Sequence, residues 1–284
     1  MSLGGMLILC LCTLQIAEAS QYSPDLLLGM GVFNAPQGVA VDPNSDALFV
    51  VDTNNNRILR FNNRSSLAPG SSPDFVFGQN TTSATANAST SQFTLTGPRS
   101  AFVDSAGFLW VADSGSNRVV WFLANASVLP VTVMGVLGQT TLAGHNANQG
   151  STTPARNSMD QPAGVTVDLN DTLWVSDTNN NRYSPFFASY SHFQIICFPR
   201  LVGFPRADSM TPFAPAQYIY GQISFGSGNP SAPSATTIYS PTGVLSSSTG
   251  LFIADTQNSR VVLSTMVFAS SKFNDFLLGI FKYW

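Results

Sequence analysis

The sequence predicts an all-β protein assembled from repeats. Three observations carry this prediction: helix-favouring charged residues are scarce, one unit recurs four times, and each unit holds a hairpin turn between short apolar runs. Of the 284 residues, 44% are hydrophobic and 10% charged, and Glu18 is the only glutamate, while Lys272 and Lys282 are the only lysines. Exposed helices usually draw on glutamate and lysine, so this composition favours strands.

Composition also narrows the function classes. The chain has 12 Lys and Arg against 15 Asp and Glu, a formal net charge of −3. A nucleic-acid-binding domain usually carries a basic excess, and a disordered tail carries far fewer apolar residues. We therefore expect a folded protein with no nucleic-acid partner.

The repeat unit starts beside a proline and ends in a strand led by arginine. The repeat cores span residues 35–61, 97–122, 161–186 and 240–264. Their prolines, Pro36, Pro98, Pro162 and Pro241, are 62, 64 and 79 residues apart. A recurring unit of this kind is one supersecondary structure that buries its apolar faces against its neighbours.

Each unit is predicted to form three short strands, followed by a fourth. In the first unit an apolar run at 38–41, a turn, a second run at 48–51 and a third run from Arg57 follow in order. The turn at 52–57 (DTNNNR) places asparagines where a hairpin needs positive φ, which Asn tolerates. Fourth strands are expected in the short runs ending in Gly-Gln at 75–79, 136–139 and 218–222. Four strands per unit indicate the blade of a β-propeller.

An Asp closes the second strand of every unit, and an Arg opens the third strand five positions later. The pairs are Asp52 with Arg57, Asp113 with Arg118, Asp177 with Arg182, and Asp255 with Arg260. They can form a structural lock or a functional charged ring. Because architecture needs the same role in every unit whereas catalysis needs one site, we interpret them as a lock.

A second set of acids ends the first strand in three units. These residues, Asp42, Asp104 and Asp168, can start a turn or bind a cation at a central channel. The fourth unit has Ser247 at this place, which weakens a metal ring. Turn initiation is favoured, and the three acids remain weak metal candidates.

The pattern Pro-x-Gly-Val-x-Val-Asp followed by apolar-Val-x-Asp-x-x-Asn-x-Arg resembles NHL repeats, and all four units follow it. The resemblance implies a β-propeller, most often six-bladed, whose faces usually bind proteins or other macromolecules. Four units imply an incomplete or truncated propeller, unless the run at 26–30 supplies the outer strand of the last blade and closes the ring.

The N-terminus is predicted to direct secretion. An apolar run at 6–16 precedes Ala17-Glu18-Ala19, which is typical of a signal peptide over residues 1–19, and the run is too short to span a bilayer. The mature domain would be residues 20–284, with no membrane span. Possible glycosylation sequons lie at Asn63, Asn80, Asn87, Asn125 and Asn170.

Two segments depart from the repeat. An aromatic stretch at 183–200 replaces the expected third strand of the third unit and contains His192 and Cys197, and residues 266–284 form an atypical tail. The stretch is either a binding loop or sequence foreign to the fold. Long polar spacers such as 80–97 are either plain connections or a recognition surface.

Catalytic signals are sparse. Secreted propellers that resemble this pattern include amidating lyases and metal-dependent lactonases, whose sites need histidine clusters or several carboxylates. After residue 19 the chain has only His145 and His192, and no Gly-x-Ser-x-Gly, phosphate-loop or Cys-x-x-Cys motif. We expect an extracellular, non-enzymatic module without a cofactor that binds a protein or glycan through propeller-face loops. The alternative is a metal-dependent hydrolase or lyase that uses the acids of the first strands.

Overall fold

The structure is a computed structural model, and it describes most of the repeat region. The described residues are 28, 32–85, 89–168, 173–180, 182–186, 221–222, 224, 226–228, 233–234 and 237–264. Within these residues the regular structure consists of strands and single turns of 3-10 helix, with no α-helix. The predicted signal peptide, the tail at 266–284, the run at 26–30 except for residue 28, and most of the segment at 183–200 lie outside them.

Four antiparallel sheets, here called blades 1 to 4, follow one another along the chain. Blade 1 contains β1 (Gly38–Val41), β2 (Leu48–Asp52), β3 (Arg57–Phe61) and β4 (Phe75–Phe77). Blade 2 contains β5 (Pro98–Val103), β6 (Phe108–Asp113), β7 (Arg118–Leu123) and β8 (Gly135–Leu137). Blade 3 contains β9 (Pro162–Val167), β10 (Leu173–Asp177) and β11 (Arg182–Phe186), and blade 4 contains β12 (Pro241–Ser247), β13 (Gly250–Asp255) and β14 (Arg260–Ser264).

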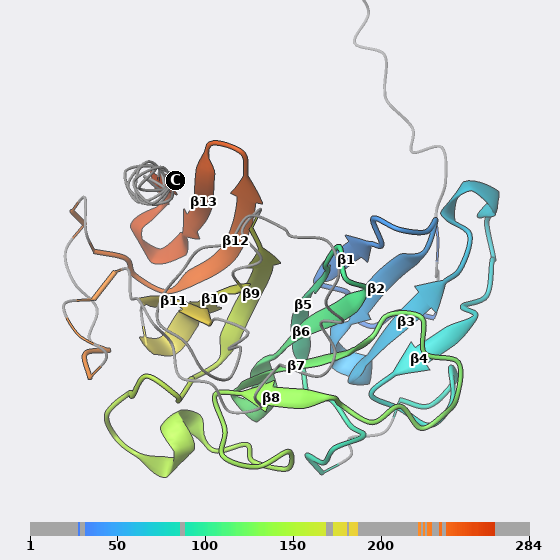
Figure 1. Ribbon diagram of the computed structural model, residues 1–284, viewed down its shortest axis with the longest axis horizontal. Coiled ribbons are helices and arrows are strands. Elements are labelled where there is room, and N and C mark those ends of the chain that lie inside the picture. Colours follow the sequence, from blue (N-terminus) through green and yellow to red (C-terminus); the bar gives the residue numbers. More distant parts are fainter. Residues whose placement is uncertain are drawn as a thin grey trace, which may run out of the picture.

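In each blade the strands pair in sequence order, as a meander. The first strands β1, β5, β9 and β12 lie side by side, and the sheets fan out from them (Figure 1). This arrangement of radiating antiparallel sheets confirms the all-β propeller fold, with four blades in the described part of the chain.

The turn between the second and third strands fixes the register of each blade. In blade 1, Asp52 pairs with Arg57 across a 3-10 turn, η1 (Thr53–Asn55), which Asn56 ends in the left-handed region at φ 54°. In blade 2 the same turn ends at Asn117 with φ 52°. The predicted positive φ is therefore confirmed at the last Asn of these two turns. Because the Asp and the Arg that flank the turn pair in every blade, the residues of these strands have equivalents in the other blades.

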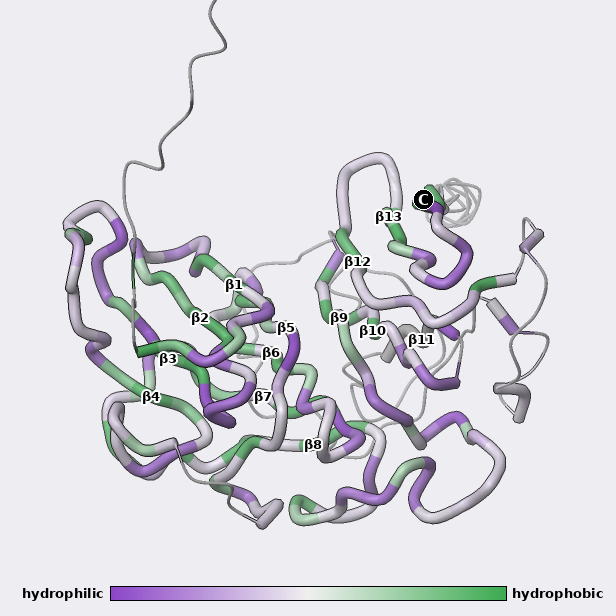
Figure 2. Tube along the Cα trace, turned by 180° about the vertical axis from the view of Figure 1, so that it is seen from behind, coloured by the Kyte–Doolittle hydropathy of each residue, from purple (hydrophilic) through white to green (hydrophobic). Residues whose placement is uncertain are grey.

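The core lies between the blades. Figure 2 shows the hydrophobic residues concentrated in strands such as β2, while the connections are largely hydrophilic. Phe49 of β2 and Val111 of β6 belong to the core between blades 1 and 2. Trp110 of β6 and Val175 of β10 belong to the core between blades 2 and 3. Burial between sheets of this kind is the main favourable contribution to folding.

Each blade therefore has two apolar faces, because successive residues of a strand point to opposite sides. We call the side that packs on the following blade the forward face, and the side that packs on the preceding blade the rear face. In β6, Trp110 lies on the forward face and Val111 on the rear face. Trp174 of β10, which is equivalent to Trp110, packs in the core shared with blade 4.

The third unit differs from its predicted form. Residues 183–186, expected to begin an irregular insertion, belong to β11, which pairs with β10 along its whole length from Asp177↔Arg182 to Leu173↔Phe186. The turn sets this register before the aromatic segment begins, and Pro185 is compatible with an outer strand because it needs no ladder donor on one side. Of the predicted fourth strands, β4 and β8 are present, and the third falls mainly outside the described residues.

Candidate recognition surface

One end of the blades carries the turns between the second and third strands and the long connections from one blade to the next. The turn between the second and third strands lies there, and so does the exit from the fourth strand, because Phe77 of β4 pairs with Ile58 next to the turn. We call this the loop end, formed by the turns together with the connections 78–97 and 138–161. The opposite end, the short-turn end, carries the connections between the first two strands and between the third and fourth.

The four predicted Asp and Arg pairs are all in contact at the loop end. Arg Nε donates to Asp Oδ2 at 2.7 Å in the first three blades and at 2.6 Å in blade 4. Both side chains are buried in blades 1 to 3. Charge-assisted bonds of this length are among the stronger polar contacts in proteins.

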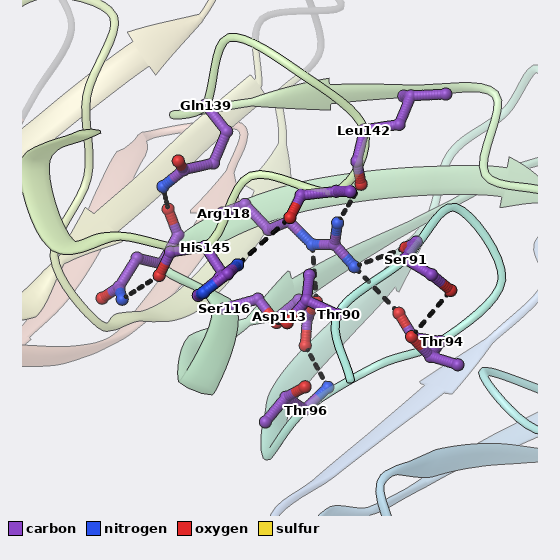
Figure 3. A network of polar contacts seen from close by, with 12 residues as sticks. Thr90, Ser91, Thr94, Thr96, Asp113, Ser116, Arg118, Gln139, Leu142 and His145 are labelled. Atoms are coloured by element: carbon purple, nitrogen blue, oxygen red, sulfur yellow. Dashed lines mark hydrogen bonds and ion pairs between the residues drawn. The ribbon is translucent and has the colours of Figure 1, made fainter. Parts of the chain in front are cut away.

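Blade 2 shows the full network (Figure 3). Asp113 Oδ1 accepts the backbone N–H of Thr96 at 2.6 Å, and Oδ2 accepts Arg118 Nε at 2.7 Å. Burial raises the pKa of Asp113, while Arg118 and the neighbouring donors oppose that rise. The carboxylate of Asp177 in blade 3 is in the same position, with its pKa raised by burial against the effect of Arg182. In both carboxylates burial disfavours the charged form, and the neighbouring arginine favours it.

The remaining guanidinium donors anchor the loops. Arg118 Nη2 donates to the carbonyls of Ser91 and Thr94 at 3.1 and 2.8 Å, and Nη1 donates to the carbonyl of Leu142 (Figure 3). These carbonyls belong to the connections before and after blade 2. In blade 3, Arg182 Nη2 holds the carbonyls of Ala155 and Ser158, both at 2.9 Å. The predicted lock therefore joins strands to loops.

The Gly-Gln ends of the fourth strands add a second anchor. Gln139 Nε2 donates to the carbonyls of Asn117 and Asn146, both at 2.9 Å. Gly138 has φ 88°, and a Cβ there would lie 2.8 Å from Met159, so glycine is needed at this bend. The motif that predicted a strand thus also ties the loop to the turn.

Sequence reasoning missed the polar latches between blades. Asn117 Oδ1 accepts the backbone N–H of Gln161 in the following blade at 2.8 Å. Thr178 Oγ1 donates to the carbonyl of Pro241 at 2.6 Å, and Ser114 Oγ donates to the carbonyl of Pro162. The recurring Asn before Arg and the Ser or Thr after Asp were the available signal. Their partners lie in the next unit, so the pattern alone could not identify the contact.

The three weak metal candidates lie at the short-turn end. Asp104 Oδ1 accepts the backbone N–H groups of Ala106 and Phe108 at 2.8 and 3.0 Å, and Oδ2 accepts Trp110 Nε1 at 2.9 Å. Asp168 Oδ2 accepts Trp174 Nε1 at 2.8 Å. Asp42 accepts the N–H of Asn44 at 2.9 Å and the hydroxyl of Ser45 at 2.8 Å. Asp42 and Asp104 therefore stabilise the turns of their own blades, and Asp168 contacts the second strand of blade 3.

The loop end presents amides, hydroxyls and a few charged groups to solvent. Asn80, Thr141, His145 and Arg156 are exposed there. The ring nitrogen Nδ1 of His145 lies 3.1 Å from the carbonyl of Ala143. Within the described residues, no group of three or more His, Cys, Asp and Glu side chains is arranged to hold a metal. The surface is therefore suited to hydrogen bonding.

The sequons that can be located are exposed. Asn63 and Asn125 lie at the short-turn end and Asn80 at the loop end. Asn87, Asn170, His192 and Cys197 lie outside the described residues. No helix among the described residues is long and apolar enough to cross a membrane.

Comparison with known proteins identifies the repeat. Residues 33–61, which contain most of the first repeat core, match the NHL repeat family. No curated protein matches the chain.

Among solved structures, the fold is similar to a streptogramin B lyase, with 14% identity and a TM-score of 0.43 over 81% of this chain and 51% of that one. It is also similar to a Bacteroides thetaiotaomicron protein of unknown function, with 15% identity and a TM-score of 0.47 over 80% of this chain and 46% of that one. A putative 6-phosphogluconolactonase from Bacteroides uniformis shares 12% identity, with a TM-score of 0.45 over 82% and 51%. The chain spans about half the length of these structures. One unit of the chain thus matches the NHL repeat, its turn and strand order recur in the other units, and the fold is a β-propeller.

Proposed function

We propose that this chain is an extracellular interaction module that binds a protein or glycan through the loop end. The observation that carries the proposal is the anchoring of exposed loops by buried arginines. Arg118 and Arg182 hold loop backbone carbonyls, while nearby side chains such as His145 and Arg156 remain exposed. A loop that is already ordered loses less conformational entropy when it binds, so more of the contact energy contributes to affinity.

The chemistry of the loop end suits uncharged polar ligands. The described part of the connections 78–97 and 138–161 is rich in Asn, Gln, Ser and Thr and contains His145, Arg156 and Asp160 as charged or titratable groups. Amides and hydroxyls can donate and accept hydrogen bonds with sugar hydroxyls and with peptide backbone. Function in a propeller of this kind lies in such loops, supported by a rigid scaffold.

The test is a binding screen with matched variants. The purified full chain is applied to arrays of soluble glycans and of extracellular protein domains. We expect at least one binder whose affinity falls about tenfold or more in Arg156→Ala or His145→Ala, which is about 1.4 kcal/mol. Arg64→Ala, an exposed change at the short-turn end, is the control and should bind as the parent does. Absence of any binder, or equal losses in the control, would exclude the loop end as the binding surface.

Secretion and the enzymatic alternative can be tested on the same material. The mass of the secreted, deglycosylated protein should correspond to residues 20–284. Metal analysis should find no stoichiometric cation. A cation that is present in the parent and lost in Asp104→Asn would support the hydrolase or lyase alternative instead.

A further inference from the structure

The forward face of blade 4 is exposed, although it carries apolar residues at the positions that are buried in the forward faces of the other blades. Phe252 of β13 occupies the place of Trp110 and Trp174, as counted from the Asp that ends each strand, yet it is 37% exposed whereas Trp110 is 3% exposed. Val261 of β14 occupies the place of Val119, and it is 69% exposed whereas Val119 is fully buried.

Two more residues complete this surface. Leu245 of β12 pairs with Phe252 and is 61% exposed, and Leu263 of β14 is 47% exposed. Leu245 is equivalent to Ala40, and Leu263 to Trp121, both of which are buried in their own blades. We call the exposed apolar set Leu245, Phe252, Val261 and Leu263 the blade 4 patch.

Blade 1 exposes part of a rear face. Val39 and Val41 of β1 are equivalent to Ala101 and Val103 of β5, because they pair with the corresponding residues of the second strand. Val39 is 68% exposed, whereas Ala101 is 7% exposed. The outer part of this face is covered, since Phe33 and Leu67 pack against it. Val39 and Val41 therefore form the open part, the blade 1 patch.

The polar latch groups of a blade joint are also present at these two ends. At the joint between blades 3 and 4, the hydroxyl of Thr178 donates to the carbonyl of Pro241. Thr256 is the equivalent hydroxyl on blade 4 and is exposed, bonding Thr242 Oγ1 at 2.6 Å in its own blade. Pro36 is the equivalent proline on blade 1 and is exposed, while Pro98, Pro162 and Pro241 are buried.

We propose that the blade 4 patch binds the blade 1 patch of a second copy of this chain. Every internal joint brings a forward face onto a rear face, and the described chain leaves one face of each kind uncovered. The two patches are thus complementary to each other, and neither is complementary to itself. The contact is head-to-tail, so it closes into a ring of copies if the rotation allows and otherwise extends. This contact between copies involves the faces of blades 1 and 4, so the proposal does not depend on the proposed function of the loop end.

The first measurement is the mass of the purified full chain in solution as a function of concentration, by sedimentation velocity. We expect the weight-average mass to rise above that of one copy by concentrations on the order of 100 µM, and to fall on dilution. A single copy at every concentration would overturn the proposal.

Charge substitutions then test the direction of the contact. Leu245→Asp and Val39→Asp should each weaken self-association at least tenfold, because an unpaired carboxylate would be buried at the joint. A mixture of the two variants should form a dimer and nothing larger, because each variant still supplies the intact patch that the other lacks. Val128→Asp, an exposed change in a connection outside both patches, is the control and should associate as the parent does.

Two results would contradict the head-to-tail arrangement. If Val39→Asp self-associates as strongly as the parent, the blade 4 patch binds something other than blade 1. If the mixture stays monomeric although both variants melt as the parent does, the patches are not partners. Should Leu245→Asp fail to fold, Leu263→Asp gives the same test from the neighbouring strand.

Discussion

Blades 2 and 4 contain the same turn in different surroundings. In both, the guanidinium Nε of the Arg contacts the Asp carboxylate, at 2.7 Å in blade 2 and 2.6 Å in blade 4. Arg118 is fully buried, whereas Arg260 is 30% exposed. The local sequence therefore forms the contact by itself, and the neighbouring blades determine how far it is removed from water. The contribution of an ion pair to the free energy of unfolding depends on this degree of burial.

The largest expected effect is the removal of the arginine from each blade. Arg118→Leu leaves Asp113 buried without its counter-charge, which should lower the free energy of unfolding by about 3–5 kcal/mol. Arg260→Leu should cost less, because Arg260 is 30% exposed and water can reach its place, although Asp255 itself is buried. Urea denaturation of the two variants and the parent measures both values.

A double variant provides the control for this comparison. Asp113→Leu combined with Arg118→Leu should recover part of the stability lost in Arg118→Leu, because no unpaired charge remains. Equal losses in Arg118→Leu and Arg260→Leu would show that burial by neighbouring blades does not set the energy of the pair.

The next largest loss of stability is expected from removing the aromatic residue of the second strand. Trp110→Ala opens a cavity between blades 2 and 3 and should cost about 3–5 kcal/mol. Phe252→Ala in blade 4 should cost less than half as much for the single copy, since the ring is already partly in water. Denaturation at low protein concentration, where copies are separate, is the measurement. A loss for Phe252→Ala as large as that for Trp110→Ala would mean that the blade 4 patch is covered even in one copy.

The latches should give a smaller difference. Asn117→Ala removes the acceptor for the backbone N–H of Gln161 and should cost about 1–2 kcal/mol. Ser259→Ala changes the equivalent position of blade 4, which is exposed and also has positive φ, at 50°. Because both variants place alanine at the same backbone geometry, the difference between them reports the two side-chain bonds of Asn117, the latch to Gln161 and the bond from its Nδ2 to the carbonyl of His145. Thermal unfolding would show a lower midpoint for Asn117→Ala alone, and matching midpoints would argue against a contribution of the latch.

The smallest effect comes from an exposed pair in blade 1. Hydrogen bonds from Ser65, together with the charge and a hydrogen bond from Arg64, lower the pKa of Asp46 below its usual value of 3.8. A depressed pKa means that the stability it provides is present above 3.8 and is lost as the pH falls through the lower folded value. The stability difference between the parent and Asp46→Asn should therefore shrink on acidification below pH 4, as denaturation at several pH values would show. A difference independent of pH would contradict the assignment.

Much of the fold followed from the sequence because it depends on short-range patterns. The spacing from Asp to Arg predicted the hairpin and its register, and the Gly-Gln runs predicted β4 and β8. The left-handed backbone of Ala35, Gln161 and Ser240, just before each proline, was not predictable from those residues. At Gln161 a contact with Asn117 of the preceding blade holds this segment in place, whereas Ala35 has the same geometry with no preceding blade among the described residues.

For the loop end, the sequence predicted which residues pair but not everything that these residues bind. The Asp and Arg pairs were expected to lock the turn, and the structure adds that each Arg also reaches the connecting loops. Turn initiation by Asp104 agrees with the interpretation favoured from the sequence, while its bond to the Trp110 indole joins two strands and is not visible in the sequence pattern. The prediction that the segment around His192 and Cys197 is either a binding loop or foreign to the fold remains a prediction, because these residues lie outside the described part of the chain.

The arginines bind backbone carbonyls of the loops, and every residue type supplies the same carbonyl. Arg118 would therefore hold the loop in place whichever side chains stood at positions 91, 94 and 142. Mutations can accumulate on the outer side of such a loop without loosening its attachment. The scaffold is for that reason well suited to diversification, whether by natural selection for new ligands or by randomised libraries displayed on the loops.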